Sequence, residues 1–128
     1  MGNGTSIGRV RGLGAAHHGP HHWLVQRFTA IGNLVLMSWL LVSFVILGDF
    51  GHASVVKWLA QPLTATAMIL LVVSLFWHAR LGLQVLVEDY IHDAGSKFAA
   101  ISVLNLATIG GGAFAIFSVA ALAFGGQA

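Results

Sequence analysis

The apolar residues of this chain are gathered into three long stretches without a charged residue, at 28–47, 58–77 and 98–128. A helix needs about 20 apolar residues to cross the hydrocarbon core of a bilayer, so each stretch is long enough. The bilayer core offers no water to backbone N–H and C=O groups, and spanning segments of this length are therefore α-helical. The pattern predicts an all-α integral membrane protein with three transmembrane helices. We place the helices near residues 24–47, 60–87 and 97–124.

Proline and glycine mark the breaks in this pattern. Pro62 stands at the start of the second span, where its missing N–H costs little. Gly48 and Gly51 are expected in the first loop, and Gly95 in the second. A run of three glycines at 110–112 lies inside the third span, where small residues allow membrane helices to approach closely.

The composition agrees with a membrane protein and excludes several other classes. The chain is 57% hydrophobic and 8% charged, whereas about a quarter of the residues of a soluble domain are charged. The formal net charge of +2 is too small to indicate a nucleic-acid partner. There is no cysteine, which excludes disulfides, thiolate catalysis and Cys-ligated metal sites within the chain.

The N-terminal residues 1–22 are polar and rich in glycine, and they predict a flexible arm ahead of a membrane anchor domain over 23–128. With three spans, this arm and the second loop lie on the same side of the membrane. That side carries Arg9, Arg11, Arg27 and Lys97. The opposite side carries only Lys57. Because Lys and Arg concentrate in the inner loops of membrane proteins, we expect the N-terminus inside.

One histidine lies deep within the second span. If that span ends near Val87, His78 lies roughly 14 Å from its end, at 1.5 Å per residue. Ionisable groups at such depth usually face a partner or a cofactor, and a neutral imidazole is a common axial ligand of haem iron. Gly82, one turn later on the same face, would let a flat macrocycle lie against the helix. The alternative is a histidine that is hydrogen-bonded to a neighbouring helix.

Asp89 and Tyr90 stand where the apolar run of the second span ends. Asp89 follows His78 by eleven residues, so it returns to within about 20° of the same helix face, about 16 Å nearer the surface. A tyrosine hydroxyl at the membrane boundary can donate a hydrogen bond to a quinone carbonyl. The simpler alternatives are an interfacial aromatic anchor for Tyr90 and a loop cap for Asp89.

Two other polar groups need a place in the membrane. Arg80 shares a helix face with Gln84 and Glu88, and we expect it to reach toward Glu88 and the lipid phosphates in a structural role. Arg27 stands at the start of the first span, after four histidines that could bind anionic lipid headgroups or haem propionates. These histidines are His17, His18, His21 and His22. Their HHGPHH segment has no helical ligand spacing, which speaks against a metal site.

The segment 76–90, FWHARLGLQVLVEDY, resembles the signature of the smaller of the two hydrophobic anchor subunits of succinate dehydrogenase (complex II). That family carries His-Ala, then Gly four residues after the His, Gln six after it, and Asp-Tyr at eleven and twelve. The matching residues here are His78-Ala79, Gly82, Gln84 and Asp89-Tyr90. The segment 21–30, HHWLVQRFTA, resembles the His…Arg-x-Thr-Ala entry of the same family.

The resemblance implies a role for each of these groups. His78 would be one axial ligand of haem b, and the larger anchor subunit of the complex would supply the second. Tyr90 would hydrogen-bond the ubiquinone head, with Asp89 supporting the site through an arginine of the partner. Arg27 and His21 would lie near the haem propionates, and Gly82 would pack against the haem. Arg80 departs from the family pattern.

The resemblance also implies a place within a larger enzyme. FAD and the iron–sulfur clusters would lie in two partner proteins, the flavoprotein subunit and the iron–sulfur subunit. This chain would not bind succinate and would have no stand-alone activity; it would be part of a heteromeric helix bundle. The expected location is the bacterial cytoplasmic (inner) membrane, with the mitochondrial inner membrane as the alternative.

Two other functions fit the same helices. The first is the anchor of a fumarate reductase or of another b-type cytochrome complex, which would share the fold. The second is a small three-helix transporter or structural membrane protein, in which His78 and Arg80 would line a polar pathway. The other two spans offer only scattered Ser, Thr and Asn residues, so the sequence shows no continuous polar track.

Overall fold

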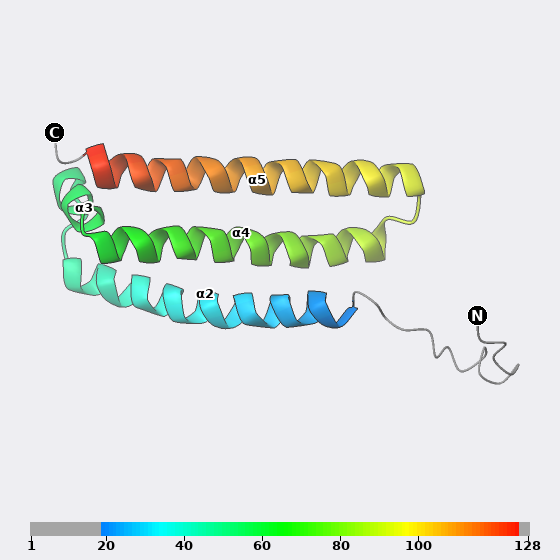
Figure 1. The fold of residues 1–128 in the computed structure, drawn as a ribbon, viewed down its shortest axis with the longest axis horizontal. Coiled ribbons are helices and arrows are strands. Elements are labelled where there is room, and N and C mark those ends of the chain that lie inside the picture. The colour runs from blue at the N-terminus through cyan, green and yellow to red at the C-terminus, as the bar shows by residue number, and fades with distance from the viewer. Residues whose placement is uncertain (1–18, 126–128) are drawn as a thin grey trace, which may run out of the picture.

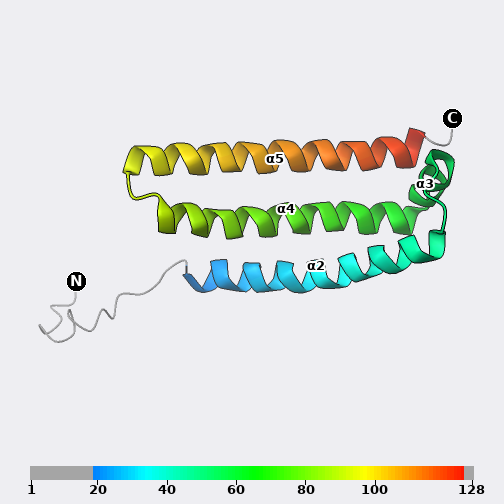
Figure 2. The same ribbon diagram turned by 180° about the vertical axis from the view of Figure 1, so that it is seen from behind.

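The computed structural model describes residues 19–125, and within this part of the chain all regular structure is helical. Three long helices, α2 (Gly19–Leu47), α4 (Pro62–Tyr90) and α5 (Ala94–Gly125), lie side by side in one layer, with α4 in the middle (Figures 1 and 2). A short helix, α3 (His52–Leu59), connects α2 to α4 at one end of the layer. Each long helix is long and apolar enough to cross a membrane. The predicted all-α class and the three spans are confirmed.

All three long helices continue past the predicted spans at the same end of the layer. Here α2 begins at Gly19 instead of 24, α4 ends at Tyr90 instead of 87, and α5 begins at Ala94 instead of 97. The apolar pattern stops where polar residues begin, but a helix can continue through polar residues wherever its end is capped. The last part of the predicted arm, from Gly19 to His22, is therefore helical, and residues 1–18 lie outside the described part.

A capped turn joins α4 to α5. An oxygen of the Asp93 side chain accepts a hydrogen bond of 2.7 Å from the backbone N–H of Ser96, in the manner of an N-cap. Hydrogen bonds from the backbone and the hydroxyl of Ser96 lower the pKa of Asp93. Lys97 donates from Nζ to the backbone oxygen of Glu88 at 3.2 Å, which ties the two helix ends together. Gly95, expected in the loop, lies in the first turn of α5.

The first loop contains Gly48 and Gly51, as predicted. Gly48 has a φ of +66°, a left-handed conformation that suits a glycine after a helix end. Asp49 accepts a hydrogen bond of 2.9 Å from the N–H of Gly51 and another from the Ser54 hydroxyl, and these bonds lower its pKa. This loop leads directly into α3.

The sequence pattern did not predict α3. The helix is held by an aromatic cluster in which Trp58 stacks on Trp39 of α2, with ring centroids 5.9 Å apart, and meets Phe44 at 5.5 Å. A helix of this length is marginal alone, so its stability comes from these contacts between distant residues. Helix α3 lies at the end of the layer opposite to the turn between α4 and α5 (Figure 1).

A single layer of helices has two open faces and little interior. The apolar side chains that are buried in the described part are Leu59, Leu71, Leu81 and Ala123. Most large apolar residues are exposed, including Phe28 at 79% and Phe114 at 73%. Apolar faces of this extent are covered by lipid or by other helices. The layer therefore has the form expected of one part of a larger membrane bundle.

Candidate functional site

His78 is held at the contact between α2 and α4, which we call the α2–α4 seam. Its Nδ1 lies 3.1 Å from the hydroxyl oxygen of Thr29 on α2, within hydrogen-bond distance. The side chain is half-buried. This contact is what the structural alternative for His78 predicts, but it occupies only one of the two ring nitrogens. The contact does not involve Nε2, which lies on the other side of the ring.

Close contacts hold the two helices together one turn away from His78. Ser74 donates a hydrogen bond of 3.3 Å to the backbone oxygen of Thr29. A Cβ atom at Gly32 would lie only 3.3 Å from the Ser74 hydroxyl oxygen, so the absence of a side chain at Gly32 allows this approach. The α2 backbone is therefore fixed against α4 at the level of Thr29.

Two amide oxygens in α2 have no partner within the described part of the chain. They are Oε1 of Gln26 and Oδ1 of Asn33, both buried. Gln26, Thr29 and Asn33 follow one another at helical spacing, so they form a polar row along one side of α2. A buried acceptor without a donor costs about 1–3 kcal/mol, so such groups are usually satisfied by water, a ligand or a partner.

Gly82 lies one turn after His78, on the side of α4 that faces Gln26. A Cβ atom at Gly82 would meet Nε2 of Gln26 at 3.6 Å, an ordinary contact distance. The packing of this chain therefore does not require a glycine at position 82. The predicted packing of Gly82 against a haem stays a prediction.

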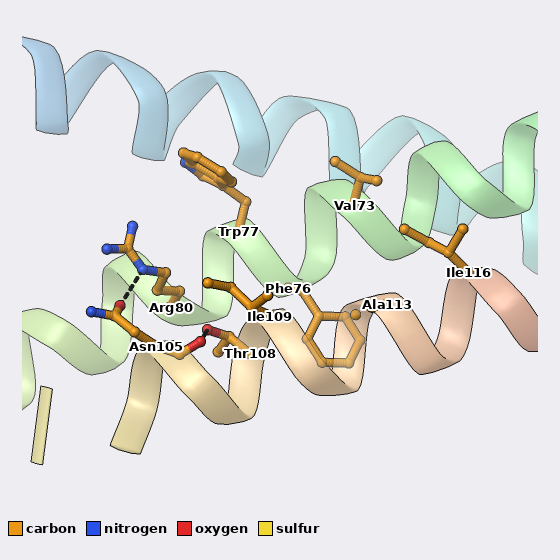
Figure 3. A pocket seen from close by; sticks show the side chains of 10 residues that line it. Val73, Phe76, Trp77, Arg80, Asn105, Thr108, Ile109, Ala113 and Ile116 are labelled. Atoms are coloured by element: carbon orange, nitrogen blue, oxygen red, sulfur yellow. Dashed lines mark hydrogen bonds between the residues drawn. The ribbon is translucent and has the colours of Figure 1, made fainter. Parts of the chain in front are cut away.

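Arg80 points to the opposite side of α4, toward α5, and its predicted partner was wrong. Its Nε donates a hydrogen bond of 2.6 Å to Oδ1 of Asn105, and its guanidinium lies 5.8 Å from the centre of the Trp77 ring (Figure 3). Glu88, the expected partner, accepts a hydrogen bond of 2.8 Å from Gln84 instead. A bond across the helix contact keeps the arginine within the protein, whereas the Glu88 contact would have required it to run along the surface of α4.

An apolar groove of about 550 Å³ runs along the α4–α5 contact, the α4–α5 seam. Arg80 and Asn105 form its polar end, and Val73, Phe76 and Ile116 line the remainder (Figure 3). A second groove, of about 390 Å³, runs between α2 and α4. Val73 and Trp77 line both grooves, so they open on the same face of the layer. His78, one residue after Trp77, lines neither of them.

The predicted quinone residues lie at the exposed end of α4. Tyr90 is 79% exposed, and Asp89 beside it is also exposed. Because α4 is an unbroken helix from Pro62 to Tyr90, the predicted spacing between His78 and Asp89 holds, with about 16 Å along the axis. His78 and the Asp89-Tyr90 pair therefore occupy two levels along one helix.

Arg27 and His21 lie in the first turns of α2. The Arg27 guanidinium stacks on the Trp23 ring, 4.3 Å from its centre, and both residues are exposed. Arg27 precedes Thr29 by two residues, so it points away from α4 and from His78. His21 is exposed in the same part of the helix. The predicted approach of both residues to haem propionates stays a prediction.

Within residues 19–125 no group of three or more His, Asp or Glu side chains is arranged to hold a metal ion. His78 thus stands as a single potential ligand in the membrane span. Among the described residues, the span therefore offers at most one half of a two-ligand arrangement.

The comparison with known families bears directly on this incomplete site. Residues 1–112 match the succinate dehydrogenase/fumarate reductase transmembrane subunit family. The chain belongs to this family, as a membrane anchor subunit. The anchor is therefore a multi-pass membrane component of an enzyme complex, which agrees with the open faces of its helix layer. No solved structure shows significant similarity to the chain.

Curated relatives of the anchor carry the corresponding names. The succinate dehydrogenase hydrophobic membrane anchor subunit of Rickettsia bellii is 38% identical over 68% of this chain and 70% of its own length. The protein of the same name in Rickettsia conorii is 37% identical over 80% of this chain and 82% of its own. The succinate dehydrogenase membrane anchor subunit of Reclinomonas americana is 29% identical over 71% and 78%. The resemblance of the chain to the membrane anchor subunits of succinate dehydrogenase is thereby confirmed.

The sequence interpretation did not assign a role to Thr29 or Asn33. Thr29 belongs to the segment that resembles the family, but its contact with His78 joins residues that are far apart in the chain. Both residues could have been identified from their helical spacing with Gln26, which places all three on one side of an otherwise apolar span.

Proposed function

We propose that this anchor supplies one axial ligand, His78, to a b-type haem whose second ligand comes from the larger anchor subunit of the complex. The observation that carries the proposal is the position of the ring. His78 is held in the α2–α4 seam through the contact of its Nδ1 with Thr29, and Nε2 would be the nitrogen that ligates iron. Metal-ligating histidines usually have their second nitrogen hydrogen-bonded in this manner.

The residues present fit such a group. A neutral imidazole within a membrane span is a suitable donor for haem iron, and Gly82 leaves the adjacent turn of α4 without a side chain. When bound, the haem would supply a one-electron redox centre inside the membrane.

We further propose that Tyr90 and Asp89 form part of the site where ubiquinone is reduced. The exposed Tyr90 hydroxyl would donate a hydrogen bond to a quinone carbonyl, and Asp89 would support the site through an arginine of the partner. Reduction of a quinone takes up protons, and groups at the membrane boundary can receive them from water. Arg27 and His21 would lie near the haem propionates.

In this proposal the anchor is the membrane end of a succinate:ubiquinone oxidoreductase. Succinate is oxidised in the flavoprotein subunit, and electrons reach the anchor through the iron–sulfur subunit. The anchor itself neither binds succinate nor has activity alone.

The excess of Lys and Arg at the Tyr90 end favours an N-terminus inside, in the inner membrane of a bacterium. The family name also includes fumarate reductase, which would run the same electron path in reverse.

An absorption spectrum of the complex purified from membranes through a tag on this chain tests the proposal. We expect the flavoprotein and iron–sulfur subunits to co-purify, with a b-type haem spectrum that changes on reduction by succinate. A complex with flavin and iron–sulfur clusters but no haem would contradict the role of His78. Oxidation of a low-potential quinol with fumarate as the acceptor, in preference to ubiquinone reduction by succinate, would favour the fumarate reductase function.

The quinone role of Tyr90 is tested by Tyr90→Phe. Removal of one hydrogen bond, worth about 1 kcal/mol, should lower the rate of ubiquinone reduction roughly three- to tenfold. Succinate oxidation with an artificial acceptor that takes electrons upstream should stay at the wild-type rate. Equal loss of both activities would show that the residue acts on assembly and not on quinone.

A further inference from the structure

The Thr29 hydroxyl has more potential partners than it has protons. Its oxygen lies 2.8 Å from the backbone oxygen of Val25, 3.1 Å from that of Gln26, and 3.1 Å from Nδ1 of His78. A threonine hydroxyl donates one hydrogen bond and accepts through its lone pairs. Backbone oxygens can only accept, so the position of the single hydroxyl proton decides what Nδ1 of His78 does.

Only one of the two histidine tautomers allows Thr29 to form two of these hydrogen bonds together. If the hydroxyl proton goes to the nearer backbone oxygen, of Val25, then Thr29 can accept a hydrogen bond from Nδ1–H of His78, and two bonds form. If the proton goes to Nδ1, the backbone contact is lost and a single bond forms. A hydrogen bond inside a protein contributes about 1 kcal/mol. The arrangement with two bonds is favoured, and it places the imidazole proton on Nδ1.

We propose that Thr29 is a positioning residue for His78, fixing the tautomer in which Nδ1 carries the proton and Nε2 carries the lone pair. This inference rests on the proposed function, since it matters most if Nε2 ligates haem iron. An acceptor at Nδ1–H also makes an imidazole a more basic ligand. A more basic ligand stabilises the ferric state and lowers the midpoint potential of the iron.

The surrounding contacts keep Thr29 in place for this task. Ser74 bonds the backbone oxygen of Thr29 from one turn before His78, and Gly32 permits the approach. The threonine is thus held between two residues of the same face of α4. A shift of α2 along α4 would break the contacts of Ser74 and of His78 together.

The chain contains a matched control on another helix. Thr108 on α5 makes the same pair of backbone contacts, 2.8 Å to the oxygen of Leu104 and 3.1 Å to that of Asn105. Both of these partners are backbone oxygens of its own helix, whereas Thr29 also reaches a histidine on a neighbouring one. Thr108→Val therefore removes a hydroxyl in an equivalent helical setting, without touching the tautomer of His78.

The test compares Thr29→Val, Thr29→Ala, Thr29→Ser and Thr108→Val in the intact complex, by haem content and by redox titration of the b-type spectrum. We expect Thr29→Val and Thr29→Ala to raise the midpoint potential and to weaken haem retention roughly tenfold, the usual effect of losing such a partner. Thr29→Ser keeps the hydroxyl and should restore both values. Thr108→Val should match the wild type.

Several outcomes would overturn the inference. A Thr29→Val or Thr29→Ala complex with the wild-type potential and haem content would do so, and so would a Thr29→Ser complex that is as altered as Thr29→Val. If Thr29→Val fails to assemble, Thr29→Ala gives the same comparison without a branched side chain. Failure of the proposed function looks different, because the wild-type complex would then lack a b-type haem, or replacement of His78 would leave its spectrum unchanged.

Discussion

Each of the two seams along α4 contains one polar side chain of α4 at nearly the same depth, but the two side chains make different contacts. In the α4–α5 seam, Arg80 bonds Asn105 of the same chain, and the nearby glycines allow Phe76 to pack closely on α5. In the α2–α4 seam, one nitrogen of His78, Nδ1, lies within hydrogen-bond distance of Thr29, and this contact does not involve the other nitrogen. The first seam joins helices, whereas the second holds the histidine that we propose as a haem ligand.

The difference shows how one contact of a histidine in a membrane span can support helix packing and also orient the ring for a ligand role. The hydrogen bond to Thr29 contributes to packing, and the same bond orients the ring and places its proton. The unpartnered oxygens of Gln26 and Asn33 also belong to α2, so within the described residues unmet hydrogen-bonding capacity gathers on the helix whose Thr29 contacts His78 of α4. Buried groups left unpaired within one chain are those that a partner, a ligand or water can complete.

The largest structural effect is expected in the α4–α5 seam, from Gly111→Val. A Cβ atom at Gly111 would lie 2.9 Å from Cε1 of Phe76, so the Phe76 ring has to shift or the helices have to move apart. Overpacking of this kind costs about 1–3 kcal/mol. The thermal midpoint of the purified complex should fall clearly, and its yield should fall with it.

Gly110 provides the control for this substitution. A Cβ atom there meets nothing within 4 Å, so Gly110→Val has the same effect on helix propensity without the clash. Adding Phe76→Leu to Gly111→Val should recover part of the loss. Equal destabilisation by the two valine substitutions would show that the close contact with Phe76 is unimportant.

A smaller effect is expected from Asn105→Leu, which leaves Nε of Arg80 without its acceptor. Hydrogen bonds between membrane helices contribute about 0.6–1.7 kcal/mol, so the thermal midpoint should fall by a few degrees or less. The double variant Arg80→Leu/Asn105→Leu should be closer to the wild type, since no polar group is left unpaired. A change in the haem potential of Asn105→Leu would contradict the division of roles between the seams.

Much of the fold could be predicted from the sequence, because hydrophobic length determines membrane spans. The spans near 24–47, 60–87 and 97–124 correspond to α2, α4 and α5. The predicted helices were too short at the polar end of the layer, since charge ends an apolar stretch without ending a helix. The short helix α3 was missed because an aromatic stack between Trp39 and Trp58, distant in the chain, supports it.

The candidate site was predictable only in part, for a related physical reason. The depth of His78 and its spacing to Asp89 follow from helical geometry along a single segment. The partners of His78 and Arg80 do not, because Thr29 and Asn105 lie on other helices. Same-helix spacing suggested Glu88 for Arg80, and the helix packing provided Asn105 instead.

The most direct test of His78 as a haem ligand is the reduced-minus-oxidised spectrum of the intact complex carrying His78→Leu, recorded beside that of Arg80→Leu. The two substitutions remove polar groups from the same part of α4 but from opposite seams. Co-purification of the flavoprotein and iron–sulfur subunits establishes assembly in each case. We predict that His78→Leu loses or alters the b-type haem spectrum, while Arg80→Leu keeps it. An unchanged spectrum in an assembled His78→Leu complex would contradict the central claim.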